Sequence, residues 1–177
     1  AARKLFQFLM MPYIAISQTI STFVSQNRGA GKPGRIRKAM MCSYLCGMAV
    51  AAAETVFMLL FAPEVVRLLT GSSESIVIEI GALYMRVVSP CLALLGILNS
   101  TRMGLQAVGK KILPLLSSVI ELAGKILFVV FFIPRFQYMA VIFCEPVIWC
   151  FMVAELLIAF WSDSFVRSKE DGKGAWQ

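Results

Sequence analysis

The strongest constraint on this chain is a series of apolar segments, each long enough to cross a lipid bilayer. Five such segments can be drawn, at 5–26, 34–62, 76–105, 112–133 and 138–163. A transmembrane helix needs about 20 mostly apolar residues. Apolar residues make up 59% of this chain and charged residues 15%, whereas typical soluble domains have about 45–50% and about 25%. The sequence therefore predicts an all-α polytopic membrane protein, with a five-helix transmembrane bundle over residues 1–163.

Prolines and polar residues set the expected ends of several spans. Pro63 is expected to begin a short amphipathic extension after the second span, and Pro134 to end the fourth span. The third span is expected to bend at Pro90. Residues 164–177 form a polar tail that is expected to be frayed or disordered.

Basic residues between the spans predict the orientation of the chain. The loop 25–39 is rich in Lys and Arg and has no acid, and such short loops stay on the cytoplasmic side. The loop 106–111 and the tail must then lie on the same side. That side carries Arg28, Lys32, Arg35, Arg37, Lys38, Arg102, Lys110, Lys111, Arg167, Lys169 and Lys173, and the other side carries Arg3, Lys4, Arg67 and Arg135. We therefore expect a multi-pass protein of the plasma membrane, in contact with its lipid bilayer, with a cytoplasmic C-terminus.

Several other classes of function are not supported by the sequence. The net charge of +7 could suggest a nucleic-acid partner, but the basic residues cluster in short loops beside the spans, so none is expected. Residues 29–34 match G-x-G-x-x-G but follow a helix rather than a strand, so we interpret them as a tight turn. The five cysteines have no C-x-x-C spacing and the chain has no His, so we expect no disulfide, metal site, cofactor or enzymatic activity.

Small residues recur at every fourth position on two spans. Gly96, Ser100 and Gly104 do so on the third span, and Gly47 and Ala51 on the second. Such rows allow helices to approach closely within lipid, so we interpret them as helix-packing surfaces.

A polar stripe on the first span and a polar residue on the third are candidates for lining a substrate cavity. Gln18 and Ser21 share one helical face with Gln7 and other polar residues, within about 100° at 3.6 residues per turn. This face is either a hydrogen-bonded seam between helices or the wall of a wet cavity. On the third span Asn99 is the informative residue, because Arg102 is expected to extend its charge to the membrane surface.

Four ionisable residues are expected to lie well inside the spans, Glu54, Arg86, Glu121 and Lys125, with Glu145 one or two helical turns below the membrane surface. Each is costly in lipid unless it is paired or hydrated. Counting residues from the span ends places Glu54 and Arg86 at one depth, and Lys125 and Glu145 at another, while Glu121 and Lys125 are four residues apart on one helix. These groups form either internal ion-pair braces or a proton or cation relay. An unpaired Glu54 would be the better proton acceptor.

Several motifs resemble those of the multidrug and toxic compound extrusion (MATE) family. The run STFVSQNRGAGKPGRIRK at 21–38 is similar to the turn after the second helix of a lobe in this family. The run TRMGLQAVGK at 101–110 is similar to the end of the fourth helix. The pair Glu121 and Lys125, and the run EPVIW at 145–149, continue the likeness into the last helices. The resemblance extends over almost the whole chain.

The resemblance implies a particular place in a larger transporter. Family members have two six-helix lobes, so these five spans would be most of the C-terminal lobe, and a preceding helix and an N-terminal lobe would be their partners. The chain has no initiator Met and opens just before a span, so it reads as a fragment. Leu95 stands near the position of an acid of the tenth helix in several members, so the resemblance assigns no cation-binding acid to this chain.

The implied activity is export of small organic, often cationic, compounds in exchange for Na⁺ or H⁺, which would be the coupling ion of the full-length protein. Two alternatives remain open. A lipid-linked saccharide flippase of the same superfamily would carry more basic residues in its cavity than the two deep ones here, Arg86 and Lys125. A truncated, non-transporting membrane scaffold would lack the partner lobe altogether.

Overall fold

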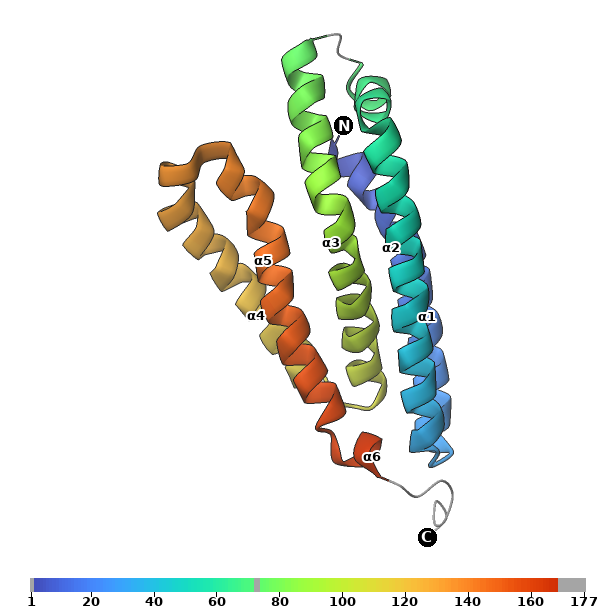
Figure 1. The fold of residues 1–177 in the computed structure, drawn as a ribbon. Helices are drawn as coiled ribbons and strands as arrows, with labels where there is room; N and C mark the ends of the chain where they lie inside the picture. Colours follow the sequence, from blue (N-terminus) through green and yellow to red (C-terminus); the bar gives the residue numbers. More distant parts are fainter. Residues whose placement is uncertain (1, 72–73, 169–177) are drawn as a thin grey trace.

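The structure, a computed structural model, describes residues 2–71 and 74–168, without the side chains of 2–5, 69, 133 and 136–142 (Figure 1). Its elements are α1 (Ala2–Gly29), α2 (Pro33–Thr70), α3 (Ser75–Ala107), α4 (Ile112–Leu127), the π-helical segment η1 (Phe128–Phe132), α5 (Ile133–Trp161) and α6 (Ser164–Arg167). Among the described residues, five helical stretches are long and apolar enough to cross a membrane. The prediction of an all-α protein with five membrane spans is confirmed.

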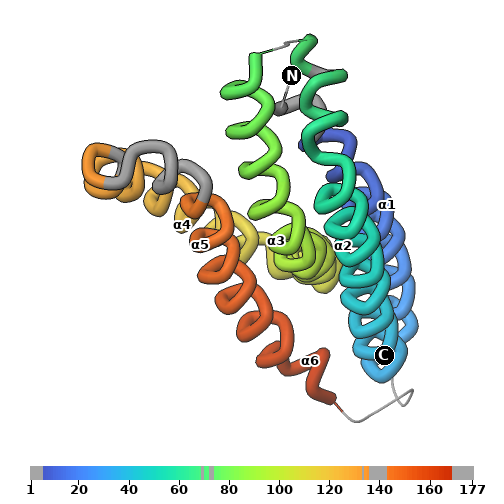
Figure 2. The backbone as a smooth tube through the Cα atoms, turned by 45° about the horizontal axis from the view of Figure 1, so that its top comes forward, coloured from blue at the N-terminus to red at the C-terminus, as the bar shows by residue number. Residues whose placement is uncertain are grey.

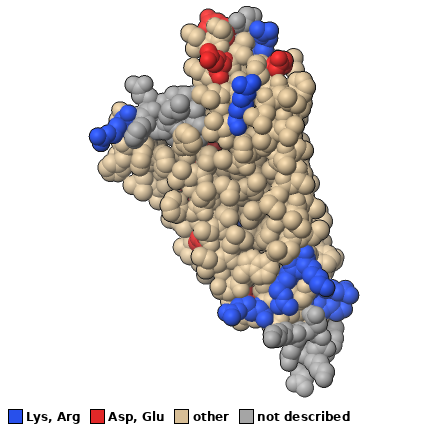
Figure 3. All heavy atoms as spheres, in the orientation of Figure 1, with Lys and Arg blue, Asp and Glu red and all other residues tan. Residues whose placement is uncertain are grey.

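The helices alternate in direction, so the connections fall at two ends of the bundle. The α1–α2 turn, the α3–α4 turn and α6 lie at one end, and the α2–α3 connection and η1 lie at the other (Figure 1). We call the first of these the basic end. Lys and Arg gather there, whereas the visible Asp and Glu side chains lie chiefly toward the opposite end (Figure 3). The loop 25–39, the loop 106–111 and the start of the tail, which the charge pattern assigned to one side of the membrane, therefore lie at the same end of the bundle.

The α1–α2 turn is as tight as the glycine-rich sequence predicts. Gly31 has a φ of 63°, a conformation that glycine adopts without strain. The backbone N–H of Lys32 donates to the carbonyl of Asn27 at 2.9 Å, and Pro33 begins α2, where a missing N–H costs nothing.

Helix α2 is longer than expected and passes through Pro63 without a break. The residues expected to form an amphipathic extension from Pro63 onward continue α2 as one helix. Proline removes only one backbone donor, and apolar packing of Met58, Ala62 and Val66 against α3 holds the helix together on both sides of Pro63. The helix ends at Gly71, whose φ is 62° and whose N–H donates to the Arg67 carbonyl at 3.0 Å.

Helices α1, α2 and α3 pack closely where the small residues face one another. A Cβ atom added to Gly47 would lie 3.8 Å from the Cα of Gly96, so the backbones of α2 and α3 almost touch there. The ring of Tyr13 on α1 covers the other side of Gly96 and is only 1% exposed. The interpretation of these residues as a packing surface is confirmed.

Helices α4 and α5 form a hairpin that leans away from the other three. Figures 1 and 2 show it next to α3 near the basic end and diverging from α3 toward η1. Pro134 lies in the first turn of α5 rather than simply ending the fourth span. Of the residues of α4, only Pro114 and Ser117 are buried. The divergence positions the cavity described below.

The start of the polar tail is ordered and packed, contrary to expectation. The side chain of Asp163 caps α6 by accepting hydrogen bonds from the backbone N–H groups of Phe165 and Val166, at 3.0 and 3.2 Å. Arg37 of α2 donates to the carbonyls of Val166 and Ser168, at 2.7 and 2.9 Å. We call this arrangement the C-terminal clasp. The remainder of the tail, 169–177, lies outside the described residues.

Candidate functional site

The α4–α5 hairpin diverges from α3 toward η1 (Figure 2). A cavity of about 340 Å³ is lined by residues of this hairpin, α1 and α3. It is lined by Phe6, Met10 and Ile14 of α1, Leu95, Leu98, Asn99 and Arg102 of α3, Glu121 and Lys125 of α4, and Glu145, Trp149 and Met152 of α5. Four of the residues singled out in the sequence, Asn99, Glu121, Lys125 and Glu145, therefore share one cavity. We call it the seam cavity.

The predicted acid–base cluster is present on the α4–α5 wall of the seam cavity. The Nζ atom of Lys125 donates to Oε1 of Glu121 at 2.8 Å, and the two side chains are 44% and 32% exposed. Glu145 of α5 lines the same cavity as this pair.

Most of the other side chains that line the seam cavity, from α1, α3 and α5, are apolar or aromatic. The rings of Phe6 and Trp149 are stacked with their centroids 6.3 Å apart, and Met10 and Met152 are buried beside them. Such a surface offers aromatic faces and polarizable sulfur next to carboxylates.

Glu54 and Arg86 lie apart, and the pair expected between them is absent. Glu54 Oε2 accepts a hydrogen bond from the Tyr13 hydroxyl at 2.8 Å, whereas Arg86 lies in an exposed groove of about 480 Å³ with Arg67 and Glu79. The depth estimate failed because α2 continues to Thr70, which places Glu54 one helical turn or more deeper than assumed. In addition, counting residues from the end of a span gives the depth of a residue in the membrane but not the face of the helix on which it lies.

Gln18 and Ser21 are not part of the seam cavity. Gln18 is exposed and Ser21 partly exposed, on a face of α1 that also carries Met11 and Ile14. No other described helix covers this polar face.

A second polar cluster, toward the basic end from the seam cavity, was missed in the sequence. Arg102 does not extend to the surface: its Nη2 donates to Oγ of Ser117 on α4 at 3.1 Å, and its Nε is buried without a hydrogen-bond partner. Glu155 on α5 also has a carboxylate oxygen, Oε2, that is buried and has no hydrogen-bond partner among the described residues. A carboxylate inside the apolar stretch Phe143–Trp161 was the signal that could have identified Glu155.

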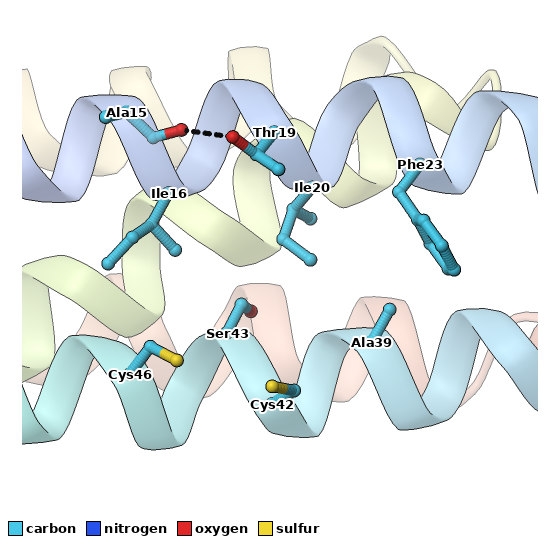
Figure 4. Close-up of a pocket in the computed structure, with 9 residues that line it drawn as sticks. All are labelled: Ala15, Ile16, Thr19, Ile20, Phe23, Ala39, Cys42, Ser43 and Cys46. Atoms are coloured by element: carbon cyan, nitrogen blue, oxygen red, sulfur yellow. Dashed lines mark hydrogen bonds between the residues drawn. The ribbon is translucent and has the colours of Figure 1, made fainter.

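A further pocket, between α1 and α2, is almost entirely apolar (Figure 4). Its volume is about 390 Å³, and its only polar groups are hydroxyls and the thiols of Cys42 and Cys46. Thr19 turns its hydroxyl back to the Ala15 carbonyl at 2.9 Å, away from any ligand. All five cysteines are free. In the part of the chain that the structure describes, no three His, Cys, Asp or Glu side chains come together to hold a metal ion.

The fold and the seam cavity together define a polytopic helical membrane protein with ionisable side chains in a cavity between its helices. The family model MatE matches residues 1–132, and the chain belongs to this family. Members of the family are transporters of the MOP superfamily rather than enzymes. No match was found among curated proteins or among solved structures.

Proposed function

We propose that this chain forms the C-terminal lobe of a secondary active transporter that exports small organic, cationic compounds in exchange for Na⁺ or H⁺. The observation that carries the proposal is the composition of the seam cavity. The carboxylates of Glu121 and Glu145 stand beside the stacked rings of Phe6 and Trp149 in a volume of about 340 Å³. Carboxylates and aromatic faces are the groups that attract organic cations in a partly desolvated site.

The exposed polar face of α1 supports the proposal that a second lobe faces this chain. Gln18, Ser21, Thr22 and Ser25 lie along this face, and polar side chains of this kind are unfavourable against hydrocarbon. We infer that a second lobe faces them across a wet central cavity, and that substrate passes along Gln18 and Ser21. Transport by alternating access requires two such halves around one site.

The distribution of charge supports one orientation in the plasma membrane. Arg28, Lys32, Arg35, Lys38 and Lys110 all lie at the basic end, and such residues are retained on the cytoplasmic side. The C-terminus would then be cytoplasmic. The same residues would contact anionic lipid headgroups.

Within the seam cavity we assign the relay role to Glu121, Lys125 and Glu145. Lys125 is hydrogen-bonded to Glu121. Glu145 is therefore the carboxylate best placed to bind a substrate cation or a coupling ion in place of Lys125. Glu54 has a neutral partner, Tyr13, and is a separate intramembrane acid.

The balance of charge in the seam cavity argues against the flippase alternative. Its ionisable lining residues are two acids, Glu121 and Glu145, and two bases, Arg102 and Lys125. A site for the phosphates of a lipid-linked saccharide would need an excess of bases.

The test uses the full-length transporter, recovered with the sequence upstream of Ala1 and reconstituted into vesicles. Efflux of ethidium should depend on an imposed Na⁺ or pH gradient, and Glu145→Gln should reduce it about tenfold. Glu64→Gln, an exposed acid at the opposite end, is the matched control and should have no effect. Efflux that is indifferent to both gradients would exclude antiport. Movement of a labelled lipid-linked saccharide in place of ethidium would establish the flippase, and no movement of either would support the scaffold.

A further inference from the structure

We propose that the apolar pocket between α1 and α2 is a lipid site, in which an acyl chain of an anionic phospholipid fills the pocket while Arg35 and Lys38 bind the phosphate of the same molecule. This inference goes beyond the proposed function, because it concerns a second ligand, whichever compound is transported. The pocket shares no lining residue with the seam cavity.

The first step is that the pocket offers almost no hydrogen bond to a ligand. Its volume is about 390 Å³, and the side chains of Ile16, Ile20 and Phe23 face α2 across it (Figure 4). The hydroxyls of Thr19 and Ser43 donate to carbonyls of their own helices, at 2.9 and 2.8 Å. A polar occupant would lose its hydrogen bonds to water there without replacement. An acyl chain has none to lose.

The second step is the position of the pocket along the helices. Its lining runs from Ala15 to Phe23 on α1 and from Ala39 to Cys46 on α2. Because the two helices run in opposite directions, Phe23 and Ala39 lie at the end of the pocket nearer the basic end (Figures 1 and 4). At 1.5 Å per residue the pocket spans about 10–12 Å. That is most of the roughly 15 Å of hydrocarbon in one leaflet, so the pocket has the length and depth of a lipid tail.

The third step is a pair of basic side chains beside the end of the pocket nearer the basic end. Arg35 precedes Ala39 by four residues, and Lys38 precedes Cys42 by four residues, so each lies one helical turn from a pocket residue on the same side of α2. Both are exposed, and the loop 25–39 contains no acid. A phospholipid has the complementary arrangement, with an anionic phosphate at the end of an apolar chain.

Two other arginines of the basic end already have partners within the chain. The guanidinium of Arg28 lies 5.3 Å from the centroid of the Phe165 ring, and Arg37 donates to the carbonyls of the C-terminal clasp. Among the described residues, the side chains of Arg35 and Lys38 form no hydrogen bond or ion pair. The bases that adjoin the pocket are therefore available to an external anion.

The proposed second lobe faces a different side of α1. At 3.6 residues per turn, the α1 residues of the pocket lie on average roughly 140° around the helix from the polar face. That face carries Gln18, Ser21, Thr22 and Ser25. The pocket therefore opens away from the side assigned to the second lobe, and lipid is the occupant that its chemistry favours.

The experiment measures lipid binding to the full-length transporter in detergent, by native mass spectrometry. The protein is titrated with dioleoylphosphatidylglycerol, which is anionic, or with dioleoylphosphatidylcholine, which has no net charge. Wild type should bind the anionic lipid about tenfold more tightly or better, and Arg35→Gln and Lys38→Gln should each weaken that binding about fivefold. Lys111→Gln removes an exposed base at the same end of the bundle and is the matched control, with no effect expected.

A second variant tests the pocket itself. Cys42→Phe places a ring in the pocket and should weaken binding of phosphatidylglycerol about tenfold. Cys150→Phe, at an exposed cysteine of α5, is its control and should have no effect. If Cys42→Phe does not fold, competition decides the same point. Glycerophosphoglycerol, the headgroup without its chains, should fail to displace the bound lipid.

Several results would overturn the proposal. These are equal affinity for the two lipids, equal losses in Arg35→Gln and Lys111→Gln, unchanged binding in Cys42→Phe, and displacement by the headgroup alone. Protection of Cys42, as the single cysteine of the full-length transporter, from a lipid-soluble maleimide would also overturn it, because another helix would then fill the pocket. Absence of ethidium efflux would overturn the proposed function instead, since lipid binding is measured without transport.

Discussion

The hydroxyl of Tyr13 donates a 2.8 Å hydrogen bond to Oε2 of Glu54 and so joins α1 to α2 within the membrane-spanning part of the bundle. The same ring lies against Gly96 and is 1% exposed, so one side chain connects three helices. Counting residues from the span ends placed Glu54 at the depth of Arg86 and suggested an ion pair between them. The partner of Glu54 is instead the neutral hydroxyl of Tyr13.

Replacing Tyr13 by Phe should destabilise the protein by about 1–3 kcal/mol, because it leaves a carboxylate in the membrane without its donor. Tyr44→Phe is the matched control, since the Tyr44 hydroxyl has neutral hydrogen-bond partners, Oγ1 of Thr101 at 2.9 Å and the side chain of Trp161. It should cost about 0.5–1.5 kcal/mol. Thermal unfolding in detergent measures both. Adding Glu54→Gln to Tyr13→Phe should recover part of the loss, and strictly additive effects would contradict the assigned bond.

Gly96→Ala should also destabilise the bundle, by about 1–3 kcal/mol. A Cβ atom at this position would lie 2.7 Å from Cδ1 of Tyr13, whose ring has no room to move. At Gly47 the nearest atom would be 3.8 Å away, which is an ordinary contact. Gly47→Ala should therefore be neutral or slightly stabilising, because alanine is the better helix former. Equal thermal unfolding midpoints for the two variants would show that α1 does not pack on α3 as described.

The C-terminal clasp should open when Arg37 is replaced. Arg37→Gln shortens the side chain that donates to the carbonyls of Val166 and Ser168, and Val166 is 0% exposed in the intact clasp. A Val166→Cys probe, in a background without the five native cysteines, should then react with maleimide several-fold faster. Arg35→Gln is the control, because Arg35 is an exposed basic residue of the same turn. Identical labelling rates in both variants would mean that the clasp does not depend on Arg37.

The sequence predicted those features that depend on one segment at a time. The five spans follow from apolar length, and the Glu121–Lys125 pair follows from a four-residue spacing on one helix. The turn at Gly31 follows from its composition. Each of these depends only on residues close together in the chain.

Features that depend on how helices are rotated against one another could not be predicted in this way. Glu54 turns toward Tyr13 and not toward Arg86, and Arg102 turns inward to Ser117 rather than outward to the surface. The opening between α3 and the α4–α5 hairpin, which brings Asn99 and Glu145 to one cavity, comes from the packing of whole helices. No local pattern of residues contains that information.

The most direct test of the account is the orientation of the bundle in intact cells. Lys32→Cys at the basic end and Glu64→Cys at the opposite end, each in a background without the native cysteines, are treated with a membrane-impermeant maleimide. The account predicts that Glu64→Cys reacts from outside and that Lys32→Cys reacts only after the membrane is permeabilised. Reaction of Lys32→Cys from outside, with Glu64→Cys protected, would contradict it.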